Sequence, residues 1–149
     1  GPLEKKDAGI QQYYRKLLSL IKRLSLEDKI ILLHQHKIRV DDASMHSLFR
    51  LCDMVFLPSF PEGEGFGLPL IEASAYHKPI IASDIRVFKE FGRSRIDYFD
   101  LDDEPADVAS SIVRVWNRNR TNKAHKAAVS EYNWDCVFSV HIIPYLKSL

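Results

Sequence analysis

Short runs of apolar residues alternate along the chain with longer segments in which apolar positions recur at the spacing of a helix. Short apolar runs bounded by turn residues are typical of strands buried in a parallel sheet. Four segments are predicted as strands, at 29–34, 54–57, 80–83 and 96–99. Because predicted helices separate these strands, the pattern indicates an α/β fold with a parallel sheet and flanking helices.

The helical spacing is clearest near the start of the chain. In residues 8–25 the apolar side chains share one face, and the basic side chains lie opposite. Asp41 or Asp42 is expected to cap the next helix, which runs to Cys52. Further helices are predicted at 69–77, 87–91, 105–117, 121–132 and 134–148, the last interrupted by Pro144.

Both tryptophans of the chain lie in predicted helices. Trp116 continues an apolar face with Ile112 and Val115, and we expect it to face the core. Trp134 opens the last helix, and we expect its large apolar side chain to anchor the tail to the core.

A glycine-rich loop joins the second predicted strand to the helix at 69–77. Gly63, Gly65 and Gly67 alternate through it, and glycine lets a ligand approach the backbone closely. Pro69 suits the first helical turn, where its missing N–H costs nothing. The first N–H groups of a helix have no partner within it, and the helix dipole favours negative charge there. The loop is therefore a candidate anion site, although a buried helix after a turn, without a ligand, explains the same glycines.

Two carboxylates flank this loop, Glu64 and Glu72, with seven residues between them. Since carboxylates repel phosphate, we expect them to face hydroxyl groups beside it. Glu72 should lie about one turn inside the helix among apolar neighbours, where an unpaired carboxylate is costly. A ribose hydroxyl would supply the missing donor, and so would a nearby Lys or Arg. A phosphate cradle with hydroxyl acceptors on both sides suits a nucleotide sugar, whereas Glu64 without a ligand is a solvated loop acid.

Length and composition narrow the classes of function. The chain has 149 residues, 46% of them hydrophobic, which is enough for one core and one domain. A net charge of +1 creates no field that attracts nucleic acid, so no nucleic-acid partner is expected. Neither the two cysteines nor His34 and His36 have the spacing of a complete metal site. No apolar run is long enough to cross a bilayer and no signal peptide is visible, which favours a cytoplasmic protein.

The loop and its surroundings resemble a known family. Pro58-Ser59, the segment from Glu64 to Pro69, Glu72-Ala73 and the segment from Lys78 to Asp84 resemble the C-terminal, donor-binding domain of retaining GT-B glycosyltransferases. The similar group, group 1 or family 4, contains many mannosyl-, glucosyl- and sucrose-type transferases, and its motif of two glutamates separated by seven residues matches Glu64 and Glu72. The resemblance covers roughly residues 28 to 135. It implies a Rossmann-like sheet and transfer of a sugar from a nucleotide diphosphate with retention of configuration, without a metal or other cofactor.

The resemblance also implies roles for the acids and amides of the loop. Glu64 would lie beside the donor sugar near its reacting carbon, as the catalytic residue, and Glu72 would accept hydrogen bonds from the ribose. The diphosphate and sugar would receive hydrogen bonds from the backbone N–H groups of four residues: Gly65, Phe66, Gly67 and Leu68. Core packing is an alternative for the side chains of Phe66 and Leu68.

Three further residues are candidates for donor binding. Ser59 follows a strand end, where open α/β sheets bind ligands, although it could serve only to cap the loop. His34 and Gln35 would lie near the nucleobase, at a place where the family usually has glycine. This departure leaves the identity of the base open.

The resembled domain begins with elements that we do not find in this sequence. A first strand, a helix and a second strand should precede Gly1 and carry an Arg and a Lys that bind the pyrophosphate. Residues 1–149 are thus expected to form a partial nucleotide-sugar-binding domain that lacks its first strand-helix-strand, with residues 121–149 as a helical tail. Gly1-Pro2 is either native or the remnant of a tag. Unpaired strand edges would favour a homodimer of the fragment.

The acceptor would be bound by an N-terminal domain outside this sequence, so the chain alone is expected to be inactive. A catalytically inactive GT-B-like interaction module is an alternative of a different class. A related epimerase or phosphorylase is a third, which the Phe66-to-Pro69 run disfavours. The sugar, the base and the acceptor are not identified, and peripheral association with the inner face of a membrane stays open.

Overall fold

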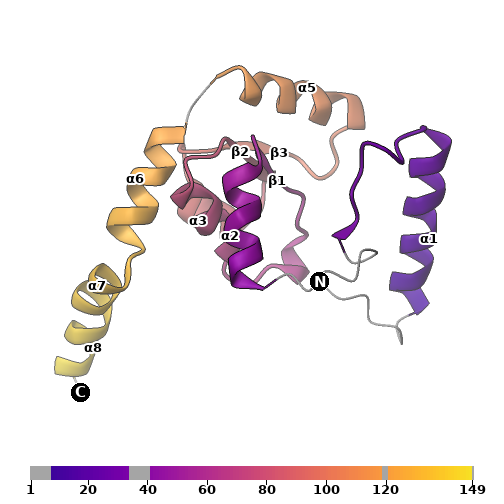
Figure 1. Ribbon diagram of the computed structural model, residues 1–149. Coiled ribbons are helices and arrows are strands. Elements are labelled where there is room, and N and C mark those ends of the chain that lie inside the picture. The colour runs from indigo at the N-terminus through magenta and orange to yellow at the C-terminus, as the bar shows by residue number, and fades with distance from the viewer. Residues whose placement is uncertain (1–7, 34–40, 119–120, 149) are drawn as a thin grey trace. The chain divides into compact units, whose positions relative to one another are not determined.

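The computed structural model describes residues 8–33, 41–118 and 121–148 (Figure 1). The chain divides into two compact units, Gly1–Met45 and His46–Leu149, and each is described by itself.

The first unit contains helix α1 (Ala8–Arg23), which confirms the predicted helix at 8–25 to within two residues. Lys22 and Arg23 lie in its last turn, where positive charge is favoured by the helix dipole. Beyond the helix, Ser25 takes a left-handed conformation with φ of 52°. The N–H of Leu26 donates to the carbonyl of Ile21 at 3.0 Å, so the chain turns away at this point.

The strand predicted at 29–34 is wrong for its described part. Residues 29–33 form a turn and irregular backbone, and residue 34 lies outside the described residues. Ile31 is 72% exposed. An apolar run becomes a strand only where a neighbouring strand accepts its backbone hydrogen bonds, and the pattern itself does not reveal whether that neighbour is present.

Helix α2 (Asp42–Leu51) begins at a carboxylate cap. The Oδ1 atom of Asp41 accepts hydrogen bonds from Ser44 Oγ at 2.6 Å and from Ser44 N at 2.9 Å. These bonds, the side-chain one first, hold the pKa of Asp41 below its ordinary value. The cap is therefore Asp41, which settles the choice between the two candidates.

The second unit is built on a parallel sheet in the order β1 (Val55–Leu57), β2 (Ile80–Ser83), β3 (Asp97–Phe99). Val55 pairs with Ile80, and Ile81 pairs with Asp97. All four residues of β2 are buried, as expected for a central strand covered on both faces. The α/β class and the strands predicted at 54–57, 80–83 and 96–99 are confirmed to within one residue.

Helices cover the sheet. Both α3 (Leu68–Ala75) and α5 (Pro105–Trp116) contact β2 (Figure 1). Helix α5 closes a core in which Val115 packs with Ile81 and Phe99. The connections include a 3₁₀ turn η2 (Pro61–Gly63) and helix α4 (Arg86–Gly92). Trp116 is 56% exposed, so its predicted burial is wrong: it is the last residue of α5, beyond the part that packs on the sheet.

Helix α6 (Thr121–Glu131) packs on α3 through small side chains. Ala124, Ala127 and Ala128 are buried there. The chain continues through α7 (Trp134–Val137), a π-helical turn η3 (Phe138–Ile142) and α8 (Ile143–Lys147). Pro144 lies in the first turn of α8, so the predicted interruption falls where the helical hydrogen-bond pattern changes.

Trp134 does not anchor this tail. Its side chain is 81% exposed, and the tail runs on from α6 away from the sheet (Figure 1). Helix α6 is held instead by its alanine face on α3, where small side chains let two helices approach closely, and by the ion pair of Glu131 with Arg95 at 2.8 Å. Burial of an aromatic side chain is favourable, but the sequence does not show whether the fold provides a surface on which it can pack.

Candidate functional site

The carboxyl ends of β1 and β2 are tied together by one buried hydroxyl. Ser83, the last residue of β2, is fully buried. Its Oγ lies 3.1 Å from the carbonyl oxygen of Leu57 and 2.6 Å from that of Ser59. Ser59 is thus held through its backbone at the start of the glycine-rich loop, at the edge of the sheet where open α/β folds bind ligands. Sequence reasoning did not single out Ser83; the one polar residue at the end of a buried apolar strand was the available signal.

The loop ends in a left-handed glycine that begins α3. Gly67 is the N-cap of the helix, with φ of 76° and ψ of 29°. A Cβ atom at this position would lie 3.3 Å from the ring of Phe88. Both the backbone conformation and the space therefore require glycine here. Pro69 lies in the first turn of α3, as expected.

Glu64 turns back onto this helix start. Its Oε1 accepts a hydrogen bond from the N–H of Gly67 at 3.0 Å, and its side chain is half-buried. The carboxylate therefore occupies one of the four amides that the sequence assigned to a ligand. Its Oε2 accepts no hydrogen bond from the described residues. Glu64 is an ordered part of the loop rather than a freely solvated acid.

The other three amides of the loop remain open. The N–H groups of Gly65, Phe66 and Leu68 donate to no group among the described residues. The side chains of Phe66 and Leu68 are 63% and 56% exposed, so core packing does not explain either of them. Unpaired N–H groups at the start of a helix attract an anion, and the ordered carboxylate of Glu64 lies next to them.

Glu72 lies in the second turn of α3 and is exposed. The expectation that it sits among apolar neighbours is wrong, because its position turns outward while Leu70, Ala73 and Ser74 turn inward. It forms no ion pair within the described part of the chain. The carboxylate is thus free to accept hydrogen bonds from a ligand, and the alternative of a paired structural acid finds no partner there.

A cleft of about 260 Å³ opens beside Glu64. One wall is the loop, with Pro61, Glu64 and Gly65. The other wall belongs to the connection after β2 and to α4, with four residues: Ile85, Arg86, Val87 and Glu90. The cleft lies at the carboxyl ends of β1 and β2, next to the open amides. Sequence reasoning missed the α4 wall, although Arg86 and Glu90 have the spacing of neighbours on one helix face.

The α4 wall is fixed to the sheet from behind. Phe88 is fully buried, and its carbonyl accepts a hydrogen bond from the hydroxyl of Tyr98 in β3 at 3.3 Å. Burial raises the pKa of Tyr98 to about 12, and the carboxylate of Asp84 adds to the effect. The side of the cleft opposite the loop is therefore attached to the sheet by a buried ring and a hydrogen bond.

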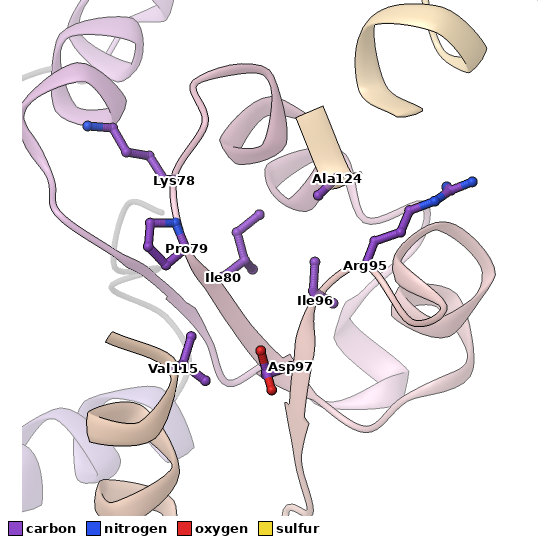
Figure 2. A pocket seen from close by; sticks show the side chains of 8 residues that line it. All are labelled: Lys78, Pro79, Ile80, Arg95, Ile96, Asp97, Val115 and Ala124. Atoms are coloured by element: carbon purple, nitrogen blue, oxygen red, sulfur yellow. The ribbon is translucent and has the colours of Figure 1, made fainter. Parts of the chain in front are cut away.

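A second hollow lies at the other ends of the strands. It is lined by residues at the starts of β2 and β3 and by α5 and α6, and holds only about 10 Å³, roughly one water molecule (Figure 2). Ile80, Val115 and Ala124 point into it, while the charged ends of Lys78 and Arg95 point outward. This hollow is a packing defect in the core and offers no room for a nucleotide.

Two of the predicted site residues cannot be placed. His34 and Gln35 lie outside the described residues, so the location of the nucleobase stays a prediction. Among the helices of the described segments, none combines the length and the apolar character needed to span a bilayer.

Comparison with known proteins identifies the family of the chain. A model of the family described as glycosyl transferases group 1 matches residues 8–128. The serotype-specific mannosyltransferase WbdA of Escherichia coli is 42% identical over 73 residues, which cover 49% of this chain and 9% of that protein. The O-antigen chain mannosyltransferase RfbU of Salmonella typhimurium is 35% identical over 97 residues, which cover 64% of this chain and 26% of that protein.

A phosphatidyl-myo-inositol mannosyltransferase of Mycobacterium tuberculosis is 33% identical over 112 residues, which cover 68% of this chain and 29% of that protein. In these three comparisons the chain spans less than a third of the length of its relatives. The family match covers most of the chain and includes the glycine-rich loop, α3 and the whole sheet. The chain belongs to the group 1 glycosyl transferases.

Proposed function

We propose that the chain is the donor-binding domain of a retaining glycosyltransferase and binds a nucleotide-diphosphate sugar. The observation that carries the proposal is the start of α3, where three amides without a partner in the described part of the chain lie beside the carboxylate of Glu64 and a cleft. The amides suit a diphosphate, and the carboxylates suit hydroxyl groups on either side of it.

The chemistry follows from where charge develops. In the transfer, the bond between the anomeric carbon and the diphosphate breaks, and negative charge grows on the leaving oxygen. Fixed N–H groups at Gly65, Phe66 and Leu68 would stabilise that charge, and one such donor is typically worth roughly 3 kcal/mol. The acceptor hydroxyl forms the new bond on the face that the diphosphate leaves, and its proton passes to the departing diphosphate oxygen. No step of this proposal needs a metal.

Glu64 has two tasks in this proposal. Its Oε1 keeps the loop closed on the N–H of Gly67, and its Oε2 accepts a hydrogen bond from the sugar near the reacting carbon. Glu72, exposed one turn into α3, accepts hydrogen bonds from the ribose. Ser59 contributes through a backbone position fixed by Ser83. The relatives named above are mannosyltransferases, so we propose a mannosyl donor, with GDP-mannose as the first candidate.

Titration calorimetry with GDP, UDP, GDP-mannose and UDP-glucose tests the proposal. We expect one nucleotide of the pair to bind, and Glu72→Ala to weaken it roughly 10-fold, the typical value of a lost charge-assisted hydrogen bond. Glu62→Ala is the matched control, because Glu62 is an exposed acid of the same loop that does not line the cleft. Equal nucleotide affinities of the Glu72 and Glu62 variants would contradict the proposed role of Glu72 in binding the ribose.

The full-length protein that carries the chain extends the test to transfer. A sugar product of unchanged anomeric configuration supports the retaining proposal, and an inverted product rejects it. We also propose that the acceptor binds to another domain and that the isolated chain is inactive. Both proposals predict that only the full-length protein transfers the sugar.

One observation favours the alternative of an interaction module. The tail exposes several large apolar side chains: Trp134, Phe138, Val140, Tyr145 and Leu146. Exposed apolar groups of this kind are typical of surfaces that meet another protein. Absence of nucleotide binding in the full-length protein would select this alternative.

A further inference from the structure

The cleft contains an ion pair that the donor site described so far does not use. Arg86 is the first residue of α4, and Glu90 lies one turn later; their Nε and Oε1 atoms are 3.0 Å apart. Their side chains are 93% and 62% exposed. An exposed pair at this spacing stabilises a helix only slightly, so stability explains little of its presence on the cleft wall.

The pair presents a donor and an acceptor side by side. The Nε of Arg86 is used by Glu90, while its Nη1 and Nη2 donate to no described residue. Glu90 likewise keeps Oε2 without a described partner. A sugar hydroxyl both donates and accepts, so two adjacent hydroxyls match a free guanidinium N–H beside a free carboxylate oxygen.

The charge of the cleft points to the same kind of ligand. Arg86 and Glu90 neutralise each other, and the remaining ionised group on the lining is Glu64. Such a lining does not attract the phosphate groups, which the open amides beside the cleft suit better. It suits a neutral molecule with many hydroxyl groups.

The size and the lining of the cleft also suit a sugar. The remaining lining is Pro61, Gly65, Ile85 and Val87, which offers apolar surface for the C–H face of a sugar ring. At about 260 Å³ the cleft is smaller than the roughly 300–1,000 Å³ typical of sites that enclose a drug-sized ligand. The space therefore suits one monosaccharide rather than a complete nucleotide sugar.

We infer that the Arg86–Glu90 pair binds adjacent hydroxyls of the donor hexose and so contributes to the choice of sugar. The inference rests on the proposed function, because it needs a nucleotide sugar with its diphosphate at the start of α3 and its hexose in the cleft beside Glu64.

The test separates the hexose from the nucleotide. The affinity gained when GDP is replaced by GDP-mannose, or UDP by UDP-glucose, measures the contribution of the sugar alone. We expect Arg86→Gln and Glu90→Gln each to reduce that gain roughly 10-fold and to change the affinity for the bare nucleotide less than twofold. Lys89→Gln is the matched control: it removes a positive charge and an ion pair from the same helix but lies outside the cleft lining.

The possible outcomes distinguish a failure of the inference from a failure of the proposed function. If the wild type binds no nucleotide sugar, the proposed function fails and the inference fails with it. If the wild type gains affinity from the hexose and both variants keep that gain, only the inference is wrong. Equal losses for GDP and GDP-mannose would place Arg86 on the diphosphate and overturn the inference. In the full-length protein, we expect the KM for the donor to rise; a rise confined to the KM for the acceptor would likewise overturn it. Circular dichroism of both variants checks that they fold.

Discussion

The two ends of the same parallel sheet differ in what they leave unsatisfied. At the carboxyl ends, three amides at the start of α3 have no partner among the described residues and lie beside a cleft of about 260 Å³. At the amino ends, α5 and α6 close over the strands and leave only about 10 Å³ (Figure 2). The difference follows from the segments next to the strands: a glycine-rich loop lies at the carboxyl ends, whereas Val115 of α5 and Ala124 of α6 lie at the amino ends.

The largest effect is expected at Gly67. Gly67→Ala forces a side chain into a left-handed backbone position with φ of 76°, 3.3 Å from the ring of Phe88. We expect the free energy of unfolding to fall by about 2–4 kcal/mol and nucleotide binding to be lost, because the helix start must shift. Urea denaturation and calorimetry measure the two effects.

Gly63→Ala is the control for this substitution. A Cβ atom at Gly63 meets nothing within 4 Å, so its stability and binding should stay close to those of the wild type. Equal behaviour of the two variants would mean that the turn into α3 has no special geometry, and the contrast between the two ends of the sheet would lose its basis.

A smaller effect is expected at the amino ends of the strands. Val115 is 4% exposed and borders the small hollow, so Val115→Ala should reduce the free energy of unfolding by about 1–3 kcal/mol. Val113 on the same helix is 60% exposed, and Val113→Ala should change stability little. Because we propose that the nucleotide binds at the other ends of the strands, neither variant should change nucleotide affinity. Loss of affinity in a well-folded Val115→Ala protein would break the functional separation of the two ends.

The smallest effect concerns the support of the cleft wall and depends on pH. The pKa of Tyr98 is raised to about 12 from 10.0, so the folded protein holds this proton more tightly than the unfolded chain does. The resulting stability is complete below pH 10 and is lost as the pH rises toward 12. Tyr98→Phe should remove the part of the fall in the free energy of unfolding that Tyr98 causes between pH 10 and pH 12. Urea denaturation across that pH range measures it. An unchanged pH profile in the variant would show that Tyr98 does not contribute to it.

The fold of the second unit could be predicted from the sequence because its strands are short apolar runs with helices between them. Every residue of β2 is buried, and the pattern at 80–83 already indicated this. The same reasoning failed at 29–33, where an equally apolar run forms no strand. Burial in a sheet depends on a neighbouring strand, and neither composition nor periodicity reports which neighbours are in place.

The loop and the start of α3 were predictable in position, but the contacts within the loop were not. The glycines and the spacing of Glu64 and Glu72 located the loop and the helix start. They did not reveal that Glu64 would accept from Gly67, three residues later, because a short local hydrogen bond competes with any ligand and leaves no periodic signal. The Arg86–Glu90 pair was missed for a related reason. Its spacing is that of an ordinary surface ion pair, and only the structure shows that both residues line the cleft.

The central claim is that open amides at the start of α3 hold the diphosphate, and amide chemical shifts test it directly. In a ¹H–¹⁵N spectrum of the chain titrated with GDP and separately with UDP, the binding nucleotide should shift the amides of Gly65, Phe66 and Leu68. The amide of Asp97, at the start of β3, should not move. Binding that shifts other residues and leaves these three amides unchanged at saturation would contradict the account.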